Sequence, residues 1–305
     1  MAEILGFSPG ALRTAQEIHE RWITLGLRGA FLARNIDTGE ELGFDAERPL
    51  PLSSVVKLPQ ALVVCDLAAR GELDLTQAAT LTPDTVTPGP TGIARFSCPA
   101  TVAAADLLYL TMAISDNAAA DVLFDLVPPA RVTERLHAWG YDDLVVRHRM
   151  RALYDAVARW TDNDMRLALR MAASATTAGG GHTLPVLDVD SGNVGTPRGL
   201  VGLLEDVWTD RVSLPAATTR VRQLLGTSVV RHRLAAELAS DSVRVSSKTG
   251  TFLHTRHDVG VVEGDSTGRI AVAALTESTV PAEIQPEADR AIGRAARLAV
   301  EVLRD

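Results

Sequence analysis

Two lysines define the chemistry that this chain can do. Lys57 and Lys248 are its only lysines, and every other basic side chain that is always charged is an arginine. Ser54 precedes Lys57 by three residues, which places both side chains on one face of a helix. A serine hydroxyl needs a base to become a nucleophile, and a lysine is a base when burial or a second cation lowers its pKa. The spacing therefore predicts Ser54 as a nucleophile and Lys57 as its base.

Two further motifs follow in the chain. Ser115-Asp116-Asn117 lies between the lysines, and Lys248 begins the run Lys248-Thr249-Gly250. Taken alone, a Ser-x-x-Lys spacing arises by chance, and Ser-Asp-Asn suits a cap between two helices. The three motifs in this order are far more specific than any one of them.

Together, the motifs resemble the signature of class A β-lactamases and penicillin-binding proteins. The turn Asp37-Thr38-Gly39-Glu40 and the runs Thr196-Pro197-Arg198 and His257-Asp258-Val259-Gly260 also fit that superfamily, so the resemblance covers nearly the whole chain. It implies a serine hydrolase that attacks a lactam, amide or ester carbonyl through an acyl-enzyme on Ser54.

The resemblance also implies roles for the other motif residues. Ser115 would relay a proton to the leaving group, and Lys248 would supply positive potential and lower the pKa of Lys57. The backbone N–H groups of Ser54 and Thr251 would form an oxyanion hole. The expected substrate-binding residues are Asn117, Thr249, Gly250, Thr251 and, more speculatively, Arg256. Asp116 is expected to stay structural.

One departure from the family pattern concerns deacylation. Class A enzymes use a Glu on the loop after the Ser-Asp-Asn helices, but here no Glu occurs between Glu134 and Glu205. By position, Asp155 is the expected substitute base and Tyr154 a weaker one. Three functions stay open: a hydrolase with atypical deacylation, a penicillin-binding-protein-like peptidase or acyltransferase, and a β-lactam-binding protein without turnover.

Composition narrows the partners. The 305 residues are 46% hydrophobic and 22% charged, which is typical of a soluble globular protein, and the net charge of −8 argues against nucleic acid. We expect a small-molecule substrate, no membrane partner and no cofactor, and we leave the oligomeric state open. The N-terminus lacks a secretory pattern, so a cytoplasmic address is expected. His254 and His257 lack a third metal ligand and are predicted to be surface strand residues.

Periodicity and turn residues predict the elements that position these motifs. Segments 73–98 and 141–195 are expected to be largely irregular. The predicted helices are 11–25, a nucleophile helix ending at Gly71, 104–113, 118–126, 131–139, 162–173, 196–208, 215–225 and 286–303. The predicted strands are 29–35, 41–44, 242–248, 258–263 and 269–276.

Strands therefore occupy both ends of the chain and helices its centre. The simplest architecture is one antiparallel sheet made from both ends, flanked by helices, with a central helical lobe. This α/β plus all-α class is also what the serine β-lactamase/transpeptidase resemblance implies. We expect one unit over 1–305, with an α/β lobe from 1–50 and 227–305, an all-α lobe over 51–226, and the site between them.

Overall fold

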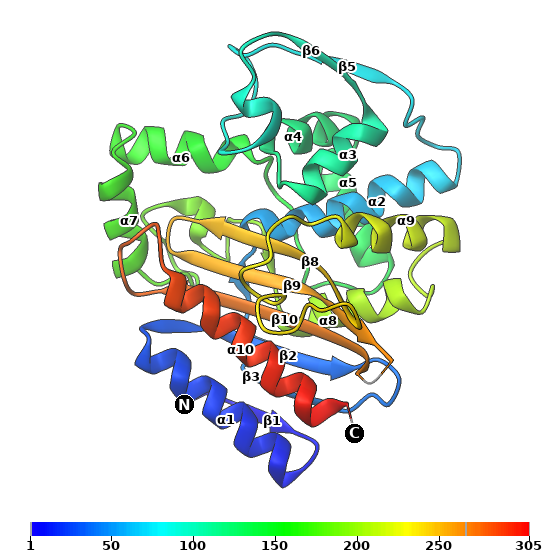
Figure 1. Cartoon of the computed structure of the whole chain (residues 1–305). Helices are drawn as coiled ribbons and strands as arrows, with labels where there is room; N and C mark the ends of the chain where they lie inside the picture. Colours follow the sequence, from blue (N-terminus) through cyan, green and yellow to red (C-terminus); the bar gives the residue numbers. More distant parts are fainter. Residues whose placement is uncertain (1, 266, 305) are drawn as a thin grey trace.

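The computed structural model describes residues 2–265 and 267–304; Met1, Ser266 and Asp305 of the predicted unit lie outside the described residues. Its main sheet has the order β1-β3-β2-β10-β9-β8, and all neighbours are antiparallel (Figure 1). The strands are β1 (Ile4–Gly6), β2 (Leu27–Asn35), β3 (Glu41–Phe44), β8 (Val243–Phe252), β9 (Thr255–Gly264) and β10 (Gly268–Ser278). The prediction of a sheet built from both chain ends is confirmed.

Helices fill the centre of the chain, as predicted. They are α1 (Pro9–Thr24), α2 (Lys57–Ala69), α3 (Ala104–Ala113), α4 (Asn117–Leu126), α5 (Pro129–Ala138), α6 (Arg151–Thr161), α7 (Met165–Ser174), α8 (Pro197–Trp208), α9 (Pro215–Gly226) and α10 (Pro286–Leu303). Short 3-10 turns are η1 (Ser53–Val56), η2 (Gly92–Arg95) and η3 (Pro185–Leu187), and two small ribbons pair β4 (Leu50–Pro51) with β7 (Val194–Gly195) and β5 (Ala78–Leu81) with β6 (Ala100–Ala103).

Helix α6 is the helix that the sequence analysis missed, because it lies in the stretch predicted to be irregular. The predicted helix at 162–173 begins later, as α7. Asp162 and Asn163 have φ values of 52° and 63°, which end α6 in the left-handed region. The Asp164 carboxylate then caps α7 by accepting hydrogen bonds from the backbone of Arg166 and Leu167.

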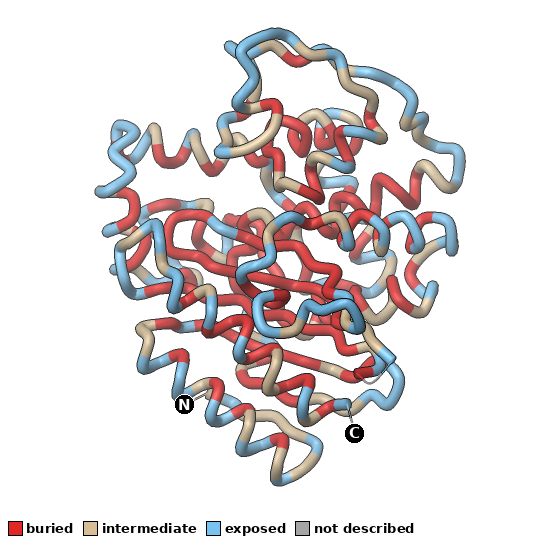
Figure 2. Tube along the Cα trace, in the orientation of Figure 1, coloured by how far each residue is buried: buried red, intermediate tan, exposed pale blue. Residues whose placement is uncertain are grey.

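The sheet is buried on both faces, and alternate residues of each strand explain how. In β2, Phe31 and Ala33 pack in the core beneath α1 and α10, whereas Ala30 and Leu32 pack in the core on the opposite side. Figures 1 and 2 show α1 and α10 lying across one face of the sheet, with buried strands behind them. This burial on both faces explains the continuous apolar runs within β2 and β10, 30–33 and 270–275.

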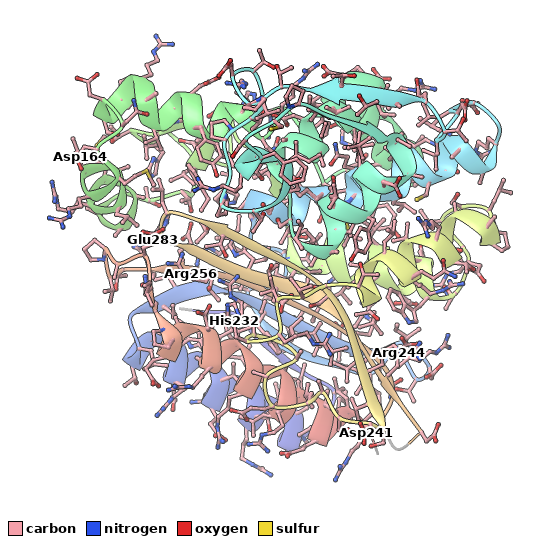
Figure 3. All side chains as sticks on the ribbon, turned by 45° about the horizontal axis from the view of Figure 1, so that its top comes forward. Asp164, His232, Asp241, Arg244, Arg256 and Glu283 are labelled. Carbon is pink, nitrogen blue, oxygen red and sulfur yellow. The ribbon has the colours of Figure 1, made fainter. Side chains whose placement is uncertain are left out.

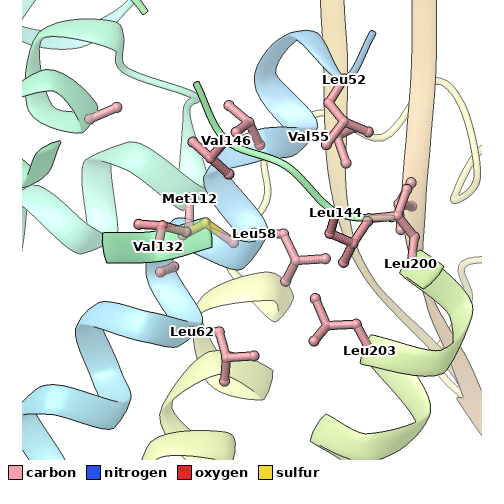
Figure 4. Close-up of a cluster of buried hydrophobic side chains, with 14 of the residues drawn as sticks. Leu52, Val55, Leu58, Leu62, Met112, Val132, Leu144, Val146, Leu200 and Leu203 are labelled. Atoms are coloured by element: carbon pink, nitrogen blue, oxygen red, sulfur yellow. The ribbon is translucent and has the colours of Figure 1, made fainter. Parts of the chain in front are cut away.

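The helical side of the molecule is organised around α2. Every residue from Lys57 to Leu67 is buried, as expected for a helix surrounded by others, and Figure 4 shows Leu58 and Leu62 among apolar side chains from several elements. The division into two lobes remains a prediction. Helix α8 belongs to the segment assigned to the all-α lobe, yet it packs against β10, β2 and β9. An ion pair of 2.9 Å between Arg34 of β2 and Glu205 of α8 joins them.

The cysteines and the helix lengths add two findings. Cys65 is a buried free thiol, whereas Cys98 is a free thiol exposed in the loop before β6. Over the described residues, no helix combines the length and apolar character needed to cross a bilayer.

Trp22 gives a direct test of how the terminal helices are fixed to the sheet. Its ring meets Phe44 edge-on, with 5.2 Å between the ring centroids, and it is 1% exposed. We expect Trp22→Ala to lower the free energy of unfolding by about 3–5 kcal/mol in urea titrations followed by circular dichroism. Ile23→Ala is the control, because that neighbour is 59% exposed and should cost less than about 0.5 kcal/mol. Equal losses of unfolding free energy in the two variants would contradict the packing of Trp22 against Phe44.

Candidate active site

Ser54 lies in η1, immediately before α2, and is half-buried. No hydrogen bond involves its hydroxyl within the described chain, so that oxygen is free to react. The neighbouring Ser53 is different: its hydroxyl is 2.7 Å from that of Thr255. Ser53 therefore anchors the turn to β9, and Ser54 presents the available oxygen. The Ser54 N–H is in the first turn of η1, where amides lack intrahelical acceptors.

Two residues of this region hold strained backbone. Ser53 has φ 48° and Ser115 has φ 58°, in the left-handed region that costs a side-chain-bearing residue free energy. Both belong to the candidate site: Ser53 precedes the proposed nucleophile, and Ser115 lies between α3 and α4. Residues held in this way cluster at functional sites, because the surrounding fold must compensate for the strain.

Lys57 is fully buried and its amine points at the Ser-Asp-Asn motif. Its Nζ lies 2.7 Å from the Ser115 carbonyl, 2.6 Å from Asn117 Oδ1 and 3.2 Å from Ser115 Oγ. The hydrogen bond predicted between Lys57 and Ser54 does not occur among the described residues. The three directions of the amine are already taken by Ser115 and Asn117, which explains the difference.

Lys248 approaches the same hydroxyl from β8. Its Nζ is 2.9 Å from Ser115 Oγ and 2.8 Å from the Thr249 carbonyl, and only 1% of the side chain is exposed. The Ser115 hydroxyl is thus shared by the two lysines of the chain. Burial lowers the pKa of Lys248 to about 7, with Arg233 adding to the effect and Asp258 opposing it.

The pKa of Lys57 lies well below its ordinary value, first because of burial and then because Lys248 is nearby. A neutral Lys57 amine donates two hydrogens, which suit its two carbonyl-type acceptors, and keeps a lone pair. Lys248 donates to Ser115 Oγ, so the Ser115 proton is free to point at that lone pair. The arrangement can therefore move a proton between Ser115 and Lys57.

The residues of β8 from Thr249 to Thr251 differ in their surroundings and in their hydrogen bonds. Thr249 is buried and its hydroxyl makes no hydrogen bond within the described chain, so it can accept a ligand contact. Thr251 is exposed on the edge strand, and its hydroxyl accepts from Arg233 Nη2 at 2.8 Å. At Gly250, a Cβ would lie 2.9 Å from the Leu52 carbonyl, so the absence of a side chain lets β8 pass close to the segment before η1. Its contact with a substrate remains a prediction.

Arg256 was wrongly predicted to bind the substrate. Its guanidinium is buried and donates to four backbone carbonyls, those of Leu253, Thr255, Ala282 and Glu283. Figure 3 shows it beside Glu283. β9 is covered on both faces, and the two terminal nitrogens of Arg256 donate to these four carbonyls. The guanidinium therefore has no pair of N–H groups free for a substrate carboxylate.

Arg233 is the buried cation that the sequence analysis missed. It donates to the Gly250 and His257 carbonyls at 3.1 and 2.8 Å and forms an ion pair of 2.6 Å with Asp289. It therefore fixes β8 from behind and adds positive potential near Thr251. Nothing in the run Arg231-His232-Arg233 distinguishes this arginine from its solvent-exposed neighbours.

Asp116 is structural, in the way that its motif position suggested. It is fully buried and caps α4 through the backbone of Ala118 and Ala119, while its other oxygen accepts from Ile93 N at 2.7 Å. Asp258, which was not predicted as a site residue, lies buried near Lys248 and Arg233 and accepts from Leu234 N at 3.0 Å. Burial raises its pKa, so it is a weak counter-charge.

The expected deacylation base is misplaced. Asp155 is exposed on α6 and makes no hydrogen bond to a site residue in the described structure. Tyr154, its weaker alternative, faces inward instead, and its hydroxyl accepts from Asn117 Nδ2 at 3.0 Å. Burial raises the pKa of Tyr154, so its phenol stays protonated at neutral pH and is a poor base.

His254 and His257 are fully buried, against the prediction of surface residues. His257 Nε2 lies 2.8 Å from the Pro51 carbonyl, and Nδ1 accepts from Thr276 N at 3.0 Å. Burial lowers the pKa of His257 to about 4, so it is neutral and ties the segment before η1 to the sheet. Among the described residues, no group of three or more His, Cys, Asp or Glu side chains could hold a metal ion.

The lowered pKa of Lys248 predicts a pH-dependent stability. In the unfolded chain its pKa returns to about 10.5, so between pH 7 and 10 the unfolded state binds more protons and the free energy of unfolding rises with pH. Lys248→Met should reduce that slope by up to about 1.4 kcal/mol per pH unit.

Urea titrations at several pH values between 7 and 10 measure this slope. Arg244→Gln is the matched control, because Arg244 is exposed on the same strand (Figure 3). An unchanged slope in Lys248→Met would show that Lys248 keeps an ordinary pKa in the folded protein.

The chain is similar to the Beta-lactamase regulatory protein BlaB of Streptomyces cacaoi, with 46% identity over 293 residues that cover 92% of this chain and 94% of BlaB. Among solved structures, a β-lactamase from Sphaerobacter thermophilus superimposes with TM-score 0.76 at 21% identity, covering 95% of each chain.

PBP-A superimposes with TM-score 0.74 at 19% identity, again covering 95% of each chain, and an ancestral class A β-lactamase with 0.75 at 22%, covering 95% of this chain and 99% of that one. The fold is thus that of class A β-lactamases, as predicted. The profile of the Beta-lactamase enzyme family matches residues 15–303, and the chain belongs to that family.

Proposed function

We propose that this protein is an active-site serine hydrolase of class A β-lactamase type that is acylated on Ser54 and deacylates slowly. The observation that carries the proposal is the Ser115 hydroxyl shared by two buried lysines, one of which follows the turn that holds Ser54 and its unengaged hydroxyl. Family membership and fold support a serine hydrolase.

Acylation needs only groups that the site contains. Ser54 Oγ attacks the carbonyl carbon of a lactam, amide or ester, and the new C–O bond replaces the C–N or C–O bond to the leaving group. Lys57 makes no hydrogen bond to Ser54 in the described chain, so its amine has to turn from Ser115 toward Ser54 to take the proton. Ser115 then gives its own proton to the departing nitrogen or oxygen and recovers one from Lys57. The backbone N–H groups of Ser54 and Thr251 remain the proposed oxyanion hole, and the Thr249 hydroxyl remains available to the substrate.

Slow deacylation follows from what surrounds the nucleophile. In the described chain, no carboxylate hydrogen-bonds to Ser54, Lys57 or Ser115. Asp116 is occupied as a helix cap, and Asp121 accepts from the backbone of Met150 and Arg151. Without a placed base, water attacks an acyl-enzyme slowly.

A second candidate function is regulatory. The relative of 46% identity carries the name Beta-lactamase regulatory protein. A protein that forms a long-lived acyl adduct could report the presence of a β-lactam without destroying it. A penicillin-binding-protein-like acyltransferase, which passes the acyl group to another acceptor, is the third alternative and shares the same first step.

The first prediction from this proposal concerns the nucleophile. Incubation with a panel of β-lactams and activated esters should add the acyl mass to the wild-type protein and not to Ser54→Ala, as measured by intact-protein mass spectrometry. Lys57→Met should slow the labelling by about 10²–10⁴-fold, because the base is lost. Ser53→Ala is the matched control and should still be labelled. A mass gain that survives in Ser54→Ala would remove Ser54 from its role.

The second prediction concerns the missing base. After excess reagent is removed, the adduct should persist, and Tyr154→Glu should shorten its lifetime by about 10²-fold because a carboxylate then lies near Asn117 and Lys57. Tyr154→Gln is isosteric with that variant but uncharged, so its adduct should not decay by base catalysis. Rapid decay of the wild-type adduct would contradict slow deacylation and favour an efficient hydrolase.

A further inference from the structure

The Asn117 side chain has no N–H left to donate to a ligand. Its Oδ1 accepts from Lys57, and its Nδ2 donates to the Pro88 carbonyl and to the Tyr154 hydroxyl, both at 3.0 Å. A carbonyl oxygen can only accept, so the Pro88 contact fixes which end of the amide is nitrogen. An amide nitrogen has two hydrogens, and both are used within the protein.

The ring of Tyr154, which pairs with Asn117, also contacts the sheet. Its centroid lies 6.2 Å from that of Phe252 at an interplanar angle of 67°, an edge-to-face contact between α6 and the end of β8. Phe252 is 7% exposed and belongs to the main core, so it has little room to withdraw. Gly89 closes another side: a Cβ there would lie 3.2 Å from Asn117 Nδ2.

Tyr154 is also held from its own helix. Asp121 Oδ1 accepts from Met150 N at 2.6 Å, and its Oδ2 accepts from Arg151 N at 2.9 Å and from the Thr87 hydroxyl at 2.6 Å. These bonds fix the first turn of α6 to α4, the helix that begins with Asn117. Moving Tyr154 aside by shifting α6 would break a buried carboxylate network, which is costly.

From these contacts we propose that Tyr154 and Phe252 fill the space beside Asn117, so that the site selects acyl donors with little or no substituent next to the reacting carbonyl. The inference rests on the proposed function and names its substrate class: small or side-chain-free lactams and esters. A donor with a bulky amide side chain has to displace the Tyr154 ring and gains no hydrogen bond from Asn117 in its place. Tyr154 and Phe252 are specificity-determining residues in this scheme.

Two penams that differ in the side chain test this proposal. Second-order rate constants for acylation of Ser54 are measured by intact-protein mass spectrometry with a 6-unsubstituted penam and with benzylpenicillin, each divided by the rate constant of that penam with hydroxide. The wild-type protein should favour the unsubstituted penam by about tenfold or more, since a filled pocket rejects added bulk to that extent. Tyr154→Ala should reduce the ratio by about tenfold through faster labelling by benzylpenicillin.

Matched variants separate ring volume from the hydroxyl and from general damage. Tyr154→Phe keeps the ring and should keep the wild-type ratio. Trp160→Ala removes an aromatic side chain that is 47% exposed on the same helix, and should leave the ratio unchanged. A thermal unfolding curve for each variant shows whether it is folded. The wild-type ratio tests the proposal even if Tyr154→Ala does not fold.

The outcomes are distinct. A wild-type ratio near one, or a Tyr154→Phe ratio equal to that of Tyr154→Ala, would overturn the steric selection while leaving acylation of Ser54 intact. If neither penam and no small activated ester labels the wild-type protein or Tyr154→Ala, the proposed function on which the selection rests is overturned instead.

Discussion

The Ser115 hydroxyl, shared by the Lys57 and Lys248 amines, is the interaction on which the site depends. Burying two cations next to each other is unfavourable, because each loses its hydration and repels the other. The protein offsets this with fixed acceptors, the Ser115 and Thr249 carbonyls and Asn117 Oδ1, and with carboxylates that lie further away. The remaining cost lowers the pKa of both amines. Burial of the lysines destabilises their charged forms, and it thereby favours neutral amines that can act as bases.

Three elements meet to make this contact, and none of them is adjacent to another in the sequence. Lys57 begins α2, Ser115 lies between α3 and α4, and Lys248 belongs to β8. The turn that carries Ser54 is fixed to the sheet at three points: Ser53 to Thr255, the Pro51 carbonyl to His257, and the Leu52 carbonyl against Gly250. A site assembled from distant segments needs such fastening, because small displacements weaken catalysis strongly.

Where this chain departs from the family pattern, it does so consistently. Where class A enzymes carry a Glu, helix α6 presents Tyr154, whose neutral phenol accepts a hydrogen bond from Asn117. Under the proposed function, the acylating groups are kept while the water-activating carboxylate is absent and the space beside Asn117 is filled. A site of this kind would react with a narrow set of acyl donors and release them slowly.

The sequence by itself determined the fold class, most helices and strands, and the residues of the lysine–serine cluster. Periodicity and caps act over a few residues, so helices such as Ala104–Ala113 and Pro286–Leu303 could be predicted to the residue. The rarity of lysine made Lys57 and Lys248 conspicuous. Only the tertiary structure decided which neighbours face the site.

Arg256 and Asp155 were misjudged for one physical reason. Sequence spacing does not reveal which face of an element is buried against a partner far away in the chain, and that partner decides what each side chain can contact. Arg256 meets backbone carbonyls, and Asp155 faces solvent while Tyr154 turns inward. Packing between distant segments, rather than local pattern, set the substrate-facing surface of this protein.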